Sequence, residues 1–132
     1  MIPCGFCKGV VNAIRLAKQA RKDFPDEKIY VLGMLVHNSY VSAELSELDI
    51  ITLDDTQKTK MELLDEIEEG IIIFTAHGIS RQIREKVIAK GLKYVDATCV
   101  DVLKTQEIIC RFLSEGYDIL YFGKKNHPEA EA

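Results

Sequence analysis

Residues 94–99, with the sequence YVDATC, decide the fold, because a short β-branched run leads there into a turn of small residues that presents the thiol of Cys99. A helical pattern follows over residues 102–113. The same order of apolar strand, reactive side chain and helix recurs along the chain. In open parallel α/β sheets, ligands bind outside the carboxyl ends of the strands, where helix N-termini also point. We therefore predict an α/β fold, a mainly parallel sheet with flanking helices, and a functional site along the carboxyl edge of that sheet.

Length and composition favour a single globular domain. The chain has 132 residues, and its 47% hydrophobic and 29% charged content is ordinary for a globular protein. The net charge of −4 argues against a general nucleic-acid binder, which is usually basic. No apolar run approaches the roughly 20 residues of a membrane helix, and no signal-peptide pattern is present. We expect a cytoplasmic protein without nucleic-acid or membrane partners, in which the four cysteines are reduced, catalytic or metal-bound.

Short apolar runs alternate with helical patterns along the chain. Besides the run that leads to Cys99, strands are predicted at residues 29–32, 50–53, 71–74 and 117–122. The predicted helices include residues 58–69, 81–90 and 102–113, and the predicted helix caps are Asn38 or Ser39, and Ser80. The run at 71–74 is apolar throughout, which is typical of a central parallel strand covered on both faces. Cys110 lies among apolar residues of the last helix and is predicted to belong to the core.

Two cysteines and three histidines are the main candidate site residues. Cys7 and Cys99 each lie in a loop of small residues just before a helix, whose N-terminus favours the thiolate that binds metal or attacks an electrophile. Free cysteines are also often small buried hydrophobes, so the residues alone leave both readings open. His37, His77 and His127 all follow predicted strands, where imidazoles and helix N-termini would suit a diphosphate or a metal. We expect these side chains to meet at one edge of the sheet.

Two further features of the sequence are ambiguous. Glu129 follows His127 by two residues and is a candidate proton donor, or else an exposed carboxylate beside Glu131. Cys4 and Cys7 form a C-x-x-C pair, the spacing of thioredoxin-like and zinc sites. Only three residues precede Cys4, however, and no second cysteine pair is present to complete a zinc site.

Five motifs occur in the order and approximate spacing of one enzyme family. They are GFC-x-GV-x-x-AI at residues 5–14, VHN at 36–38, AHGIS at 76–80, DATC at 96–99 and HPE at 127–129. On these motifs the chain resembles the 4-hydroxy-3-methylbut-2-enyl diphosphate reductases, the LytB-type iron–sulfur enzymes that end the non-mevalonate isoprenoid pathway. The resemblance covers nearly the whole chain.

The resemblance implies a three-lobed enzyme built around a [4Fe-4S] cluster. Residues 1–99 would form the first α/β lobe, which carries two cluster-cysteine motifs, and residues 100–132 would begin a second, truncated α/β lobe. Cys7 and Cys99 match two of the metal ligands of the family. Ligands far apart in sequence suit a cluster placed where several lobes meet.

The same resemblance implies roles for the histidines and for Glu129. His37, His77 and His127 match the histidines that bind the substrate, and Glu129 matches the carboxylate of the proton relay, in which His127 would also serve catalysis. The implied reaction is the reductive dehydroxylation of 4-hydroxy-3-methylbut-2-enyl diphosphate to isopentenyl and dimethylallyl diphosphate. Ferredoxin or a flavodoxin-type protein would donate the electrons.

The chain departs from the family pattern at three points. The strand that normally leads into the first cysteine loop is nearly absent. The chain ends just after Glu129, before the third cluster cysteine, and neither Cys4 nor Cys110 falls in a family motif. Val100 stands where the family has a proline after the cluster cysteine. We therefore expect an N-terminal portion that is inactive alone, with the cluster absent or incomplete. The alternatives are a non-catalytic α/β remnant that binds diphosphates and a C-x-x-C thiol oxidoreductase.

Overall fold

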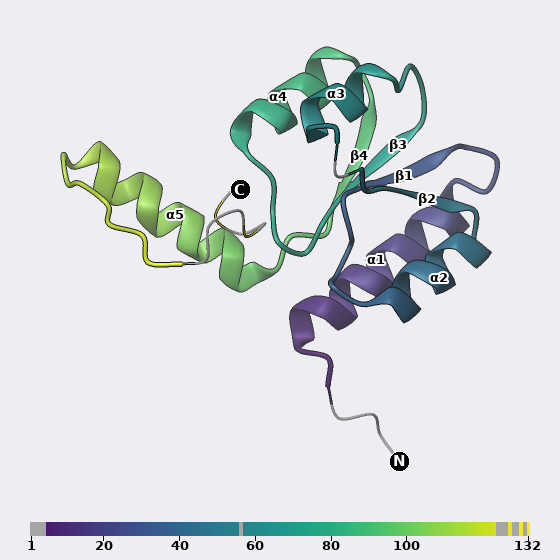
Figure 1. The fold of residues 1–132 in the computed structure, drawn as a ribbon, viewed down its shortest axis with the longest axis horizontal. Helices are drawn as coiled ribbons and strands as arrows, with labels where there is room; N and C mark the ends of the chain where they lie inside the picture. The colour runs from purple at the N-terminus through teal and green to yellow at the C-terminus, as the bar shows by residue number, and fades with distance from the viewer. Residues whose placement is uncertain (1–4, 56, 124–126, 128–129, 131) are drawn as a thin grey trace.

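Four parallel strands form the sheet on which the fold is built. The structure is a computed structural model that describes residues 5–55, 57–123, 127, 130 and 132. The strands are β1 (Ile29–Leu32), β2 (Ile50–Leu53), β3 (Ile71–Phe74) and β4 (Lys93–Asp96), in the order β2-β1-β3-β4 (Figure 1). Their first residues pair with one another across the sheet, and each strand is four residues long. The strands therefore also end level, and the loops that follow them leave from one edge.

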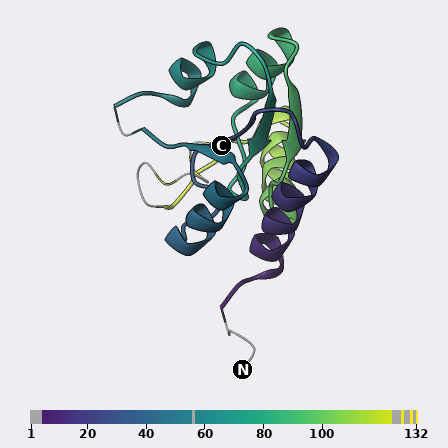
Figure 2. The same ribbon diagram turned by 90° about the vertical axis from the view of Figure 1, so that its right-hand side faces the viewer.

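Two pairs of helices cover the two faces of the sheet. α1 (Lys8–Asp23) and α2 (Ser39–Glu47) lie on one face, and α3 (Lys60–Asp65) and α4 (Arg81–Ala89) lie on the other (Figure 1). Figure 2 shows α1 and α2 running side by side along their face. This arrangement confirms the predicted α/β fold with a parallel sheet and flanking helices.

Alternation along the strands divides the core into two layers. Successive residues of a strand point to opposite faces, so Ile71 and Ile73 pack under α1 and α2, whereas Ile72 and Phe74 pack under α3 and α4. All four residues of β3 are buried, as predicted for a central strand. On the α1 side, Ala17 is fully buried, and its small side chain lets the helix lie close to the strands.

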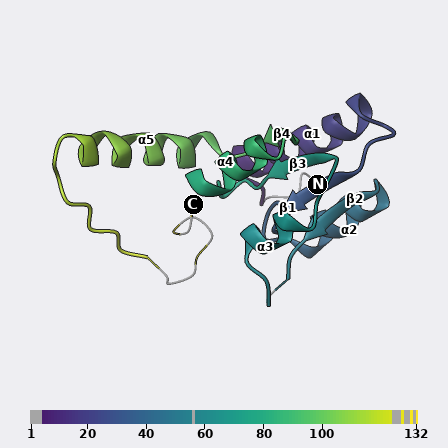
Figure 3. The same cartoon turned by 90° about the horizontal axis from the view of Figure 1, so that it is seen from above.

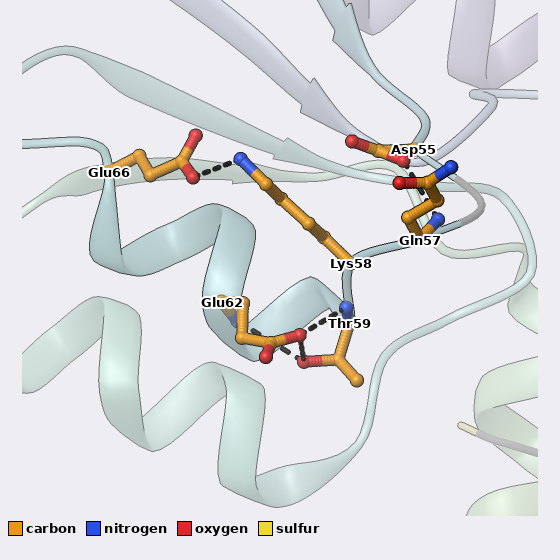
Figure 4. A network of polar contacts seen from close by, with 6 residues as sticks. All are labelled: Asp55, Gln57, Lys58, Thr59, Glu62 and Glu66. Atoms are coloured by element: carbon orange, nitrogen blue, oxygen red, sulfur yellow. Dashed lines mark hydrogen bonds and ion pairs between the residues drawn. The ribbon is translucent and has the colours of Figure 1, made fainter.

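Polar side chains begin the helices that follow the first three strands. The side chain of Asn38 accepts hydrogen bonds from two amides in the first turn of α2, and Ser80 accepts one in α4. Thr59 and Glu62 form a reciprocal capping box at the start of α3, which Figure 4 shows from close by. Each cap satisfies backbone N–H groups that have no partner within the helix, and so fixes where the helix begins.

α3 is shorter than the predicted helix over residues 58–69. The capping box starts the helix one residue after Thr59, so Lys58 lies outside it and forms an ion pair with Glu66 beyond its other end (Figure 4). Gly70 then turns the chain into β3 with a φ of 119°, a conformation open to glycine. Ile67 is buried although it lies outside the helix. It therefore continues the apolar periodicity from which the longer helix was predicted.

The order of the strands creates a switch point between β1 and β3. The chain leaves β1 for α2 on one face of the sheet and leaves β3 for α4 on the other face. The two loops therefore diverge at the carboxyl ends of these neighbouring strands. Switch points of this kind are where ligands bind in open α/β sheets.

α5 (Val100–Ser114) extends away from the sheet, and none of its residues is buried (Figure 3). Its first turns lie against Gly78, because a Cβ atom built on that glycine would come within 3.3 Å of Val102 and 3.1 Å of Gln106. No helix among the described residues is long and apolar enough to cross a membrane.

Two predictions about the end of the chain are wrong. Residues 117–122 are not a strand, because no described strand pairs with them and an extended segment without a partner is not a β-strand. Cys110 is exposed rather than part of the core, because α5 leaves the sheet and its apolar face has no described layer to pack against. The predicted boundary between two lobes at residue 99 stays a prediction.

Arg21 ties together the amino end of the sheet. Its guanidinium donates hydrogen bonds of 2.7–3.2 Å to five backbone carbonyls, those of Phe24, Pro25, Glu27, Leu48 and Asp49. Three of these carbonyls belong to the link between α1 and β1, and two to the link between α2 and β2. One side chain therefore holds both links in place at the edge opposite the switch point.

We expect Arg21→Met to lower the free energy of unfolding by about 2 kcal/mol, because methionine keeps an aliphatic stem but removes the charged donors. Lys22→Met is the matched control, because Lys22 is exposed and occupies the same last turn of α1. It should change stability by less than about 0.5 kcal/mol. Urea denaturation followed by circular dichroism measures both. Equal losses in the two variants would contradict the assigned role of Arg21.

Candidate functional site

Hydrogen bonds continue the pattern of the sheet beyond the ends of the strands. The amide of Ala76 donates to the carbonyl of Leu35 at 3.1 Å, and the amide of Cys99 donates to the carbonyl of Ala76 at 3.0 Å. The amide of Ala97 likewise donates to the carbonyl of Phe74 at 3.2 Å. The loops after β1, β3 and β4 are therefore held side by side. This row of loops carries His37, His77 and Cys99.

The three histidines lie together at the switch point. His37 follows β1 and His77 follows β3, and their ring centroids are 4.5 Å apart with an angle of 33° between the planes. The ring of His127 lies 6.3 Å from that of His37 and 6.2 Å from that of His77. His127 thus joins the pair across fifty residues of sequence, although the segment that carries it follows no strand. A tight turn closed by the bond from Gly78 N–H to Thr75 C=O orients His77.

The two motif cysteines begin two helices that converge. Cys7 is the N-cap of α1 and Cys99 is the N-cap of α5, and neither thiol caps its own helix. A Cβ atom built on Gly9 would lie 2.6 Å from Sγ of Cys99 and 3.7 Å from Sγ of Cys7. Both sulfurs therefore lie against the same glycine, and the missing side chain of Gly9 is what lets the helix ends come this close.

Asp96 anchors the turn that leads to Cys99. Its Oδ1 accepts hydrogen bonds from the amide of Thr98 at 3.0 Å and from its hydroxyl at 2.5 Å, and its Oδ2 accepts one from Arg84 at 2.6 Å. Burial raises the pKa of the Asp96 carboxyl, but the hydrogen bonds from Thr98 and Arg84 outweigh it and hold the pKa below its ordinary value. For Arg84, burial lowers the pKa, and the pairing with Asp96 more than compensates, so the guanidinium stays charged.

A cavity of about 740 Å³ opens beside the cysteines and His77. Its lining includes Cys7, His77 and Cys99 and, from α5, Gln106 and Cys110. Cys110 follows Cys99 by eleven residues, which places it roughly 16 Å farther along the helix. The two thiols of α5 therefore cannot bind the same metal centre.

Two of the described residues could contribute to the ligand set of an iron–sulfur cluster. Cys7 and Cys99 present their two thiols against the bare backbone of Gly9. Thiolates are the ligands that such clusters use. Within the described ranges, however, no three His, Cys, Asp or Glu side chains are placed to hold a metal ion. Cys4 and Glu129 lie outside the described residues.

The sequence alone did not reveal every residue that shapes this site. The pairing of Arg84 with Asp96 joins α4 to β4, and no local pattern indicates it. Gly9 falls inside the first motif, so its presence was visible, but its contact with Cys99 depends on two segments ninety residues apart. A glycine placed two residues after a cysteine at a helix start was the one available signal.

We expect Asp96→Asn to lower the free energy of unfolding by about 1–2 kcal/mol at neutral pH, because it removes a charge-assisted hydrogen bond. The pKa of Asp96 is depressed in the folded protein, so its stabilisation is present above the unfolded pKa of about 3.9 and is lost as pH falls through the folded pKa. The difference in free energy of unfolding between wild type and Asp96→Asn should therefore become smaller in acid. Urea denaturation from about pH 7 down to about pH 3 measures it. A difference in free energy of unfolding that stays constant with pH would contradict the stabilising role of the Asp96 carboxylate.

We expect Gly9→Ala not to gain the ~1 kcal/mol that alanine normally adds inside a helix, because its methyl group would overlap the sulfur of Cys99. In a Cys99→Ala background the overlap with the sulfur is removed and a 3.0 Å approach to the Cβ of residue 99 remains, so most of the gain should return. The double-mutant cycle, measured by urea denaturation, should give a coupling of about 1 kcal/mol. Gly5→Ala is the control, since a Cβ atom there meets nothing within 4 Å. Additive effects would show that Gly9 does not contact Cys99.

Comparisons with known proteins agree on one family. A family model described as LytB protein matches residues 1–132. The 4-hydroxy-3-methylbut-2-enyl diphosphate reductase of Geobacillus thermodenitrificans (strain NG80-2) is 48% identical over 131 residues, which is 98% of this chain and 40% of that protein. The enzyme of the same name from Symbiobacterium thermophilum is 47% identical over 98% of this chain and 43% of its own length.

Two solved structures share the fold. The E-1-hydroxy-2-methyl-but-2-enyl-4-diphosphate reductase from Plasmodium falciparum superposes with a TM-score of 0.82 at 39% identity, over 97% of this chain and 38% of that one. A second structure, (E)-4-hydroxy-3-methyl-but-2-enyl diphosphate reductase, gives a TM-score of 0.80 at 35% identity and covers 96% of this chain and 42% of that one. The chain thus spans about 40% of the length of the curated relatives it matches. By the match of the family model along its whole length, the chain belongs to the LytB protein family.

Proposed function

We propose that this chain supplies the cluster-binding edge and part of the substrate pocket of a 4-hydroxy-3-methylbut-2-enyl diphosphate reductase. The reaction would add two electrons and two protons to the substrate and release its hydroxyl group as water, which gives isopentenyl and dimethylallyl diphosphate. The observation that carries the proposal is the convergence of two thiols and three imidazoles at the carboxyl edge of the sheet. The curated relatives of that name are more than twice as long, so we assign only part of the site to these residues.

Cys7 and Cys99 would be two of the ligands of a [4Fe-4S] cluster. Their sulfurs lie against Gly9 and at the mouth of a cavity large enough for a small ligand. When bound, the cluster would supply electrons and a Lewis-acidic iron for the hydroxyl oxygen of the substrate. A further ligand has to come from outside the described residues, because these contain no third suitable side chain at the site. An external ferredoxin or flavodoxin-type donor and a cytoplasmic setting belong to the same proposal.

His37, His77 and His127 would bind the diphosphate group. Imidazole N–H groups donate hydrogen bonds to phosphate oxygens, and a protonated ring adds a positive charge. The three rings come from three separate segments, so together they can surround an anion rather than contact one side of it. His127 and Glu129 would deliver protons, and Glu129 remains a prediction from the sequence because it lies outside the described residues.

The alternative is a diphosphate-binding α/β module without redox chemistry. The incomplete metal-ligand set of the described residues favours it. It keeps the histidine cluster in the same role and treats Cys7 and Cys99 as packing residues. The two functions differ in whether the chain binds iron and in whether that binding depends on both cysteines.

Anaerobic reconstitution with iron and sulfide tests the proposal. Wild type should bind thiolate-ligated iron, seen by visible absorption and, after reduction, by EPR, with less than the full four irons of a [4Fe-4S] cluster, because a further ligand is absent from the described residues. Cys7→Ser and Cys99→Ser should each retain less than about a tenth of that iron, since each loses a direct ligand. Cys110→Ser is the matched control and should behave as wild type, because its exposed thiol lies too far along α5 to reach the same centre.

Binding of inorganic pyrophosphate, measured by calorimetry, separates the two functions. Pyrophosphate binding that His77→Ala abolishes, without any cysteine-dependent iron, would support the binding module and overturn the cluster assignment. Cysteine-dependent iron together with histidine-dependent pyrophosphate binding would support the reductase site. Neither form of binding would reject both functions for this chain.

A further inference from the structure

The turn from Asp96 to Cys99 is fixed at both ends. At its start, the Asp96 carboxylate accepts hydrogen bonds from both the amide and the hydroxyl of Thr98. At its end, the amide of Cys99 donates to the carbonyl of Ala76 in the neighbouring loop. Thr98 is 5% exposed, so water offers its hydroxyl little alternative to Asp96. The backbone that carries the Cys99 thiol therefore has few other conformations available.

Arg84 holds the carboxylate itself in place. Its guanidinium reaches from α4 to Asp96 and lies over two aromatic rings, 5.2 Å from the centroid of Phe74 and 5.8 Å from that of Tyr94. Those rings stack on each other with centroids 5.0 Å apart. A guanidinium that rests on an aromatic pair loses little further freedom when it binds a carboxylate. The side chain of Asp96 is consequently oriented before Thr98 binds to it.

We propose that Asp96, held by Arg84, is a positioning residue for Cys99, which it keeps directed at Cys7 so that both thiols face one centre. Because the Cys99 sulfur lies close against Gly9, the turn has to place that thiol accurately. The proposal rests on the proposed function, because it assigns to Arg84, Asp96 and Thr98 the orientation of a cluster ligand. None of the three needs to touch the cluster or the substrate.

The other end of β4 offers a matched control. Lys93, the first residue of that strand, pairs with Glu27 at 2.6 Å, the same distance as the pair of Arg84 and Asp96. Its ammonium likewise lies over an aromatic ring, 5.0 Å from the centroid of Phe24. Glu27→Gln thus removes an ion pair of the same kind from the same strand, far from the cysteines. A general effect of weakening β4 would appear in both variants.

A bifunctional thiol reagent that fluoresces only after both its arms have reacted, such as dibromobimane, measures the proximity of Cys7 and Cys99 without any cluster. Cys4 and Cys110 are first replaced by serine, which leaves two of the four cysteines. Asp96→Ala should slow the bridging of Cys7 and Cys99 about tenfold, because it removes both the charge-assisted bond to Arg84 and the closure of the turn. Asp96→Asn keeps an acceptor for the Thr98 amide, so its bridging rate should lie between those of wild type and Asp96→Ala. Glu27→Gln should bridge at the wild-type rate.

Thr98 provides a second pair of variants with less risk to folding. Thr98→Val removes only the hydroxyl donor and should slow bridging, and Thr98→Ser keeps that donor and should restore it. Urea denaturation of each variant confirms that the folded state is being measured. Bridging at the wild-type rate in Asp96→Ala and Thr98→Val, or equal slowing in Glu27→Gln, would overturn the proposal. A wild-type chain that bridges readily but binds no iron would instead reject the proposed function and leave the positioning role standing.

Discussion

The backbone N–H and C=O of Ala76 are the groups on which the site depends. Its amide bonds to the loop after β1 and its carbonyl bonds to the loop after β4, so three loops are joined through one residue. Without this continuation of the ladder, the loops would leave the strands independently, and no single edge would exist. The level register of the four strands makes such bonding feasible, because it brings the loops out at the same height. Secondary structure and site geometry are therefore consequences of one hydrogen-bond pattern.

Stability and chemistry lie at opposite edges of the sheet. At the amino edge, Arg21 satisfies backbone carbonyls of two links and presents little of itself for other uses. At the carboxyl edge, the histidine rings and the thiols are exposed or half-buried, and the cysteines leave their own helix ends uncapped. A site built from exposed and half-buried side chains depends on support from elsewhere in the fold. The buried strand β3 and the clamp at the far edge provide that support.

Much of the fold was predictable from local pattern. Short apolar runs predicted the four parallel strands, and polar residues such as Asn38 and Ser80 predicted where helices begin. Both signals act within a few residues of the chain. The errors arose where a segment depends on a partner. Residues 117–122 have the composition of a strand but no described strand beside them, and Cys110 has apolar neighbours but no layer to pack against. Composition indicates which secondary structure a segment can form, but whether it forms it depends on the elements packed beside it.

The site was predictable to a similar extent. His37, His77 and Cys99 were visible as reactive side chains that follow strands, and Cys7 as a thiol in a loop before a helix. The carboxyl edge of a parallel sheet gathers side chains that follow its strands, whatever the sequence between them. His127 was expected beside the other two rings because a strand was predicted over residues 117–122. The structure forms no strand there, yet the ring of His127 joins the other two. The pairing of Arg84 with Asp96 left no trace in the sequence, because a cation on an aromatic pair depends on three elements meeting.

α5 divides the molecule into regions of unequal local stability. A helix with no buried residue has little apolar area to hold it folded, so its amide hydrogens exchange through openings that cost far less free energy than unfolding of the sheet. Cys99 lies at the hinge between these regions, bonded by its own amide to the sheet while its carbonyl begins the helix. The bond from its amide to the sheet would therefore hold the thiol in place during a local opening of the helix. Access to the cavity thus depends on α5, whereas the position of the Cys99 thiol depends on the bond between its amide and the sheet.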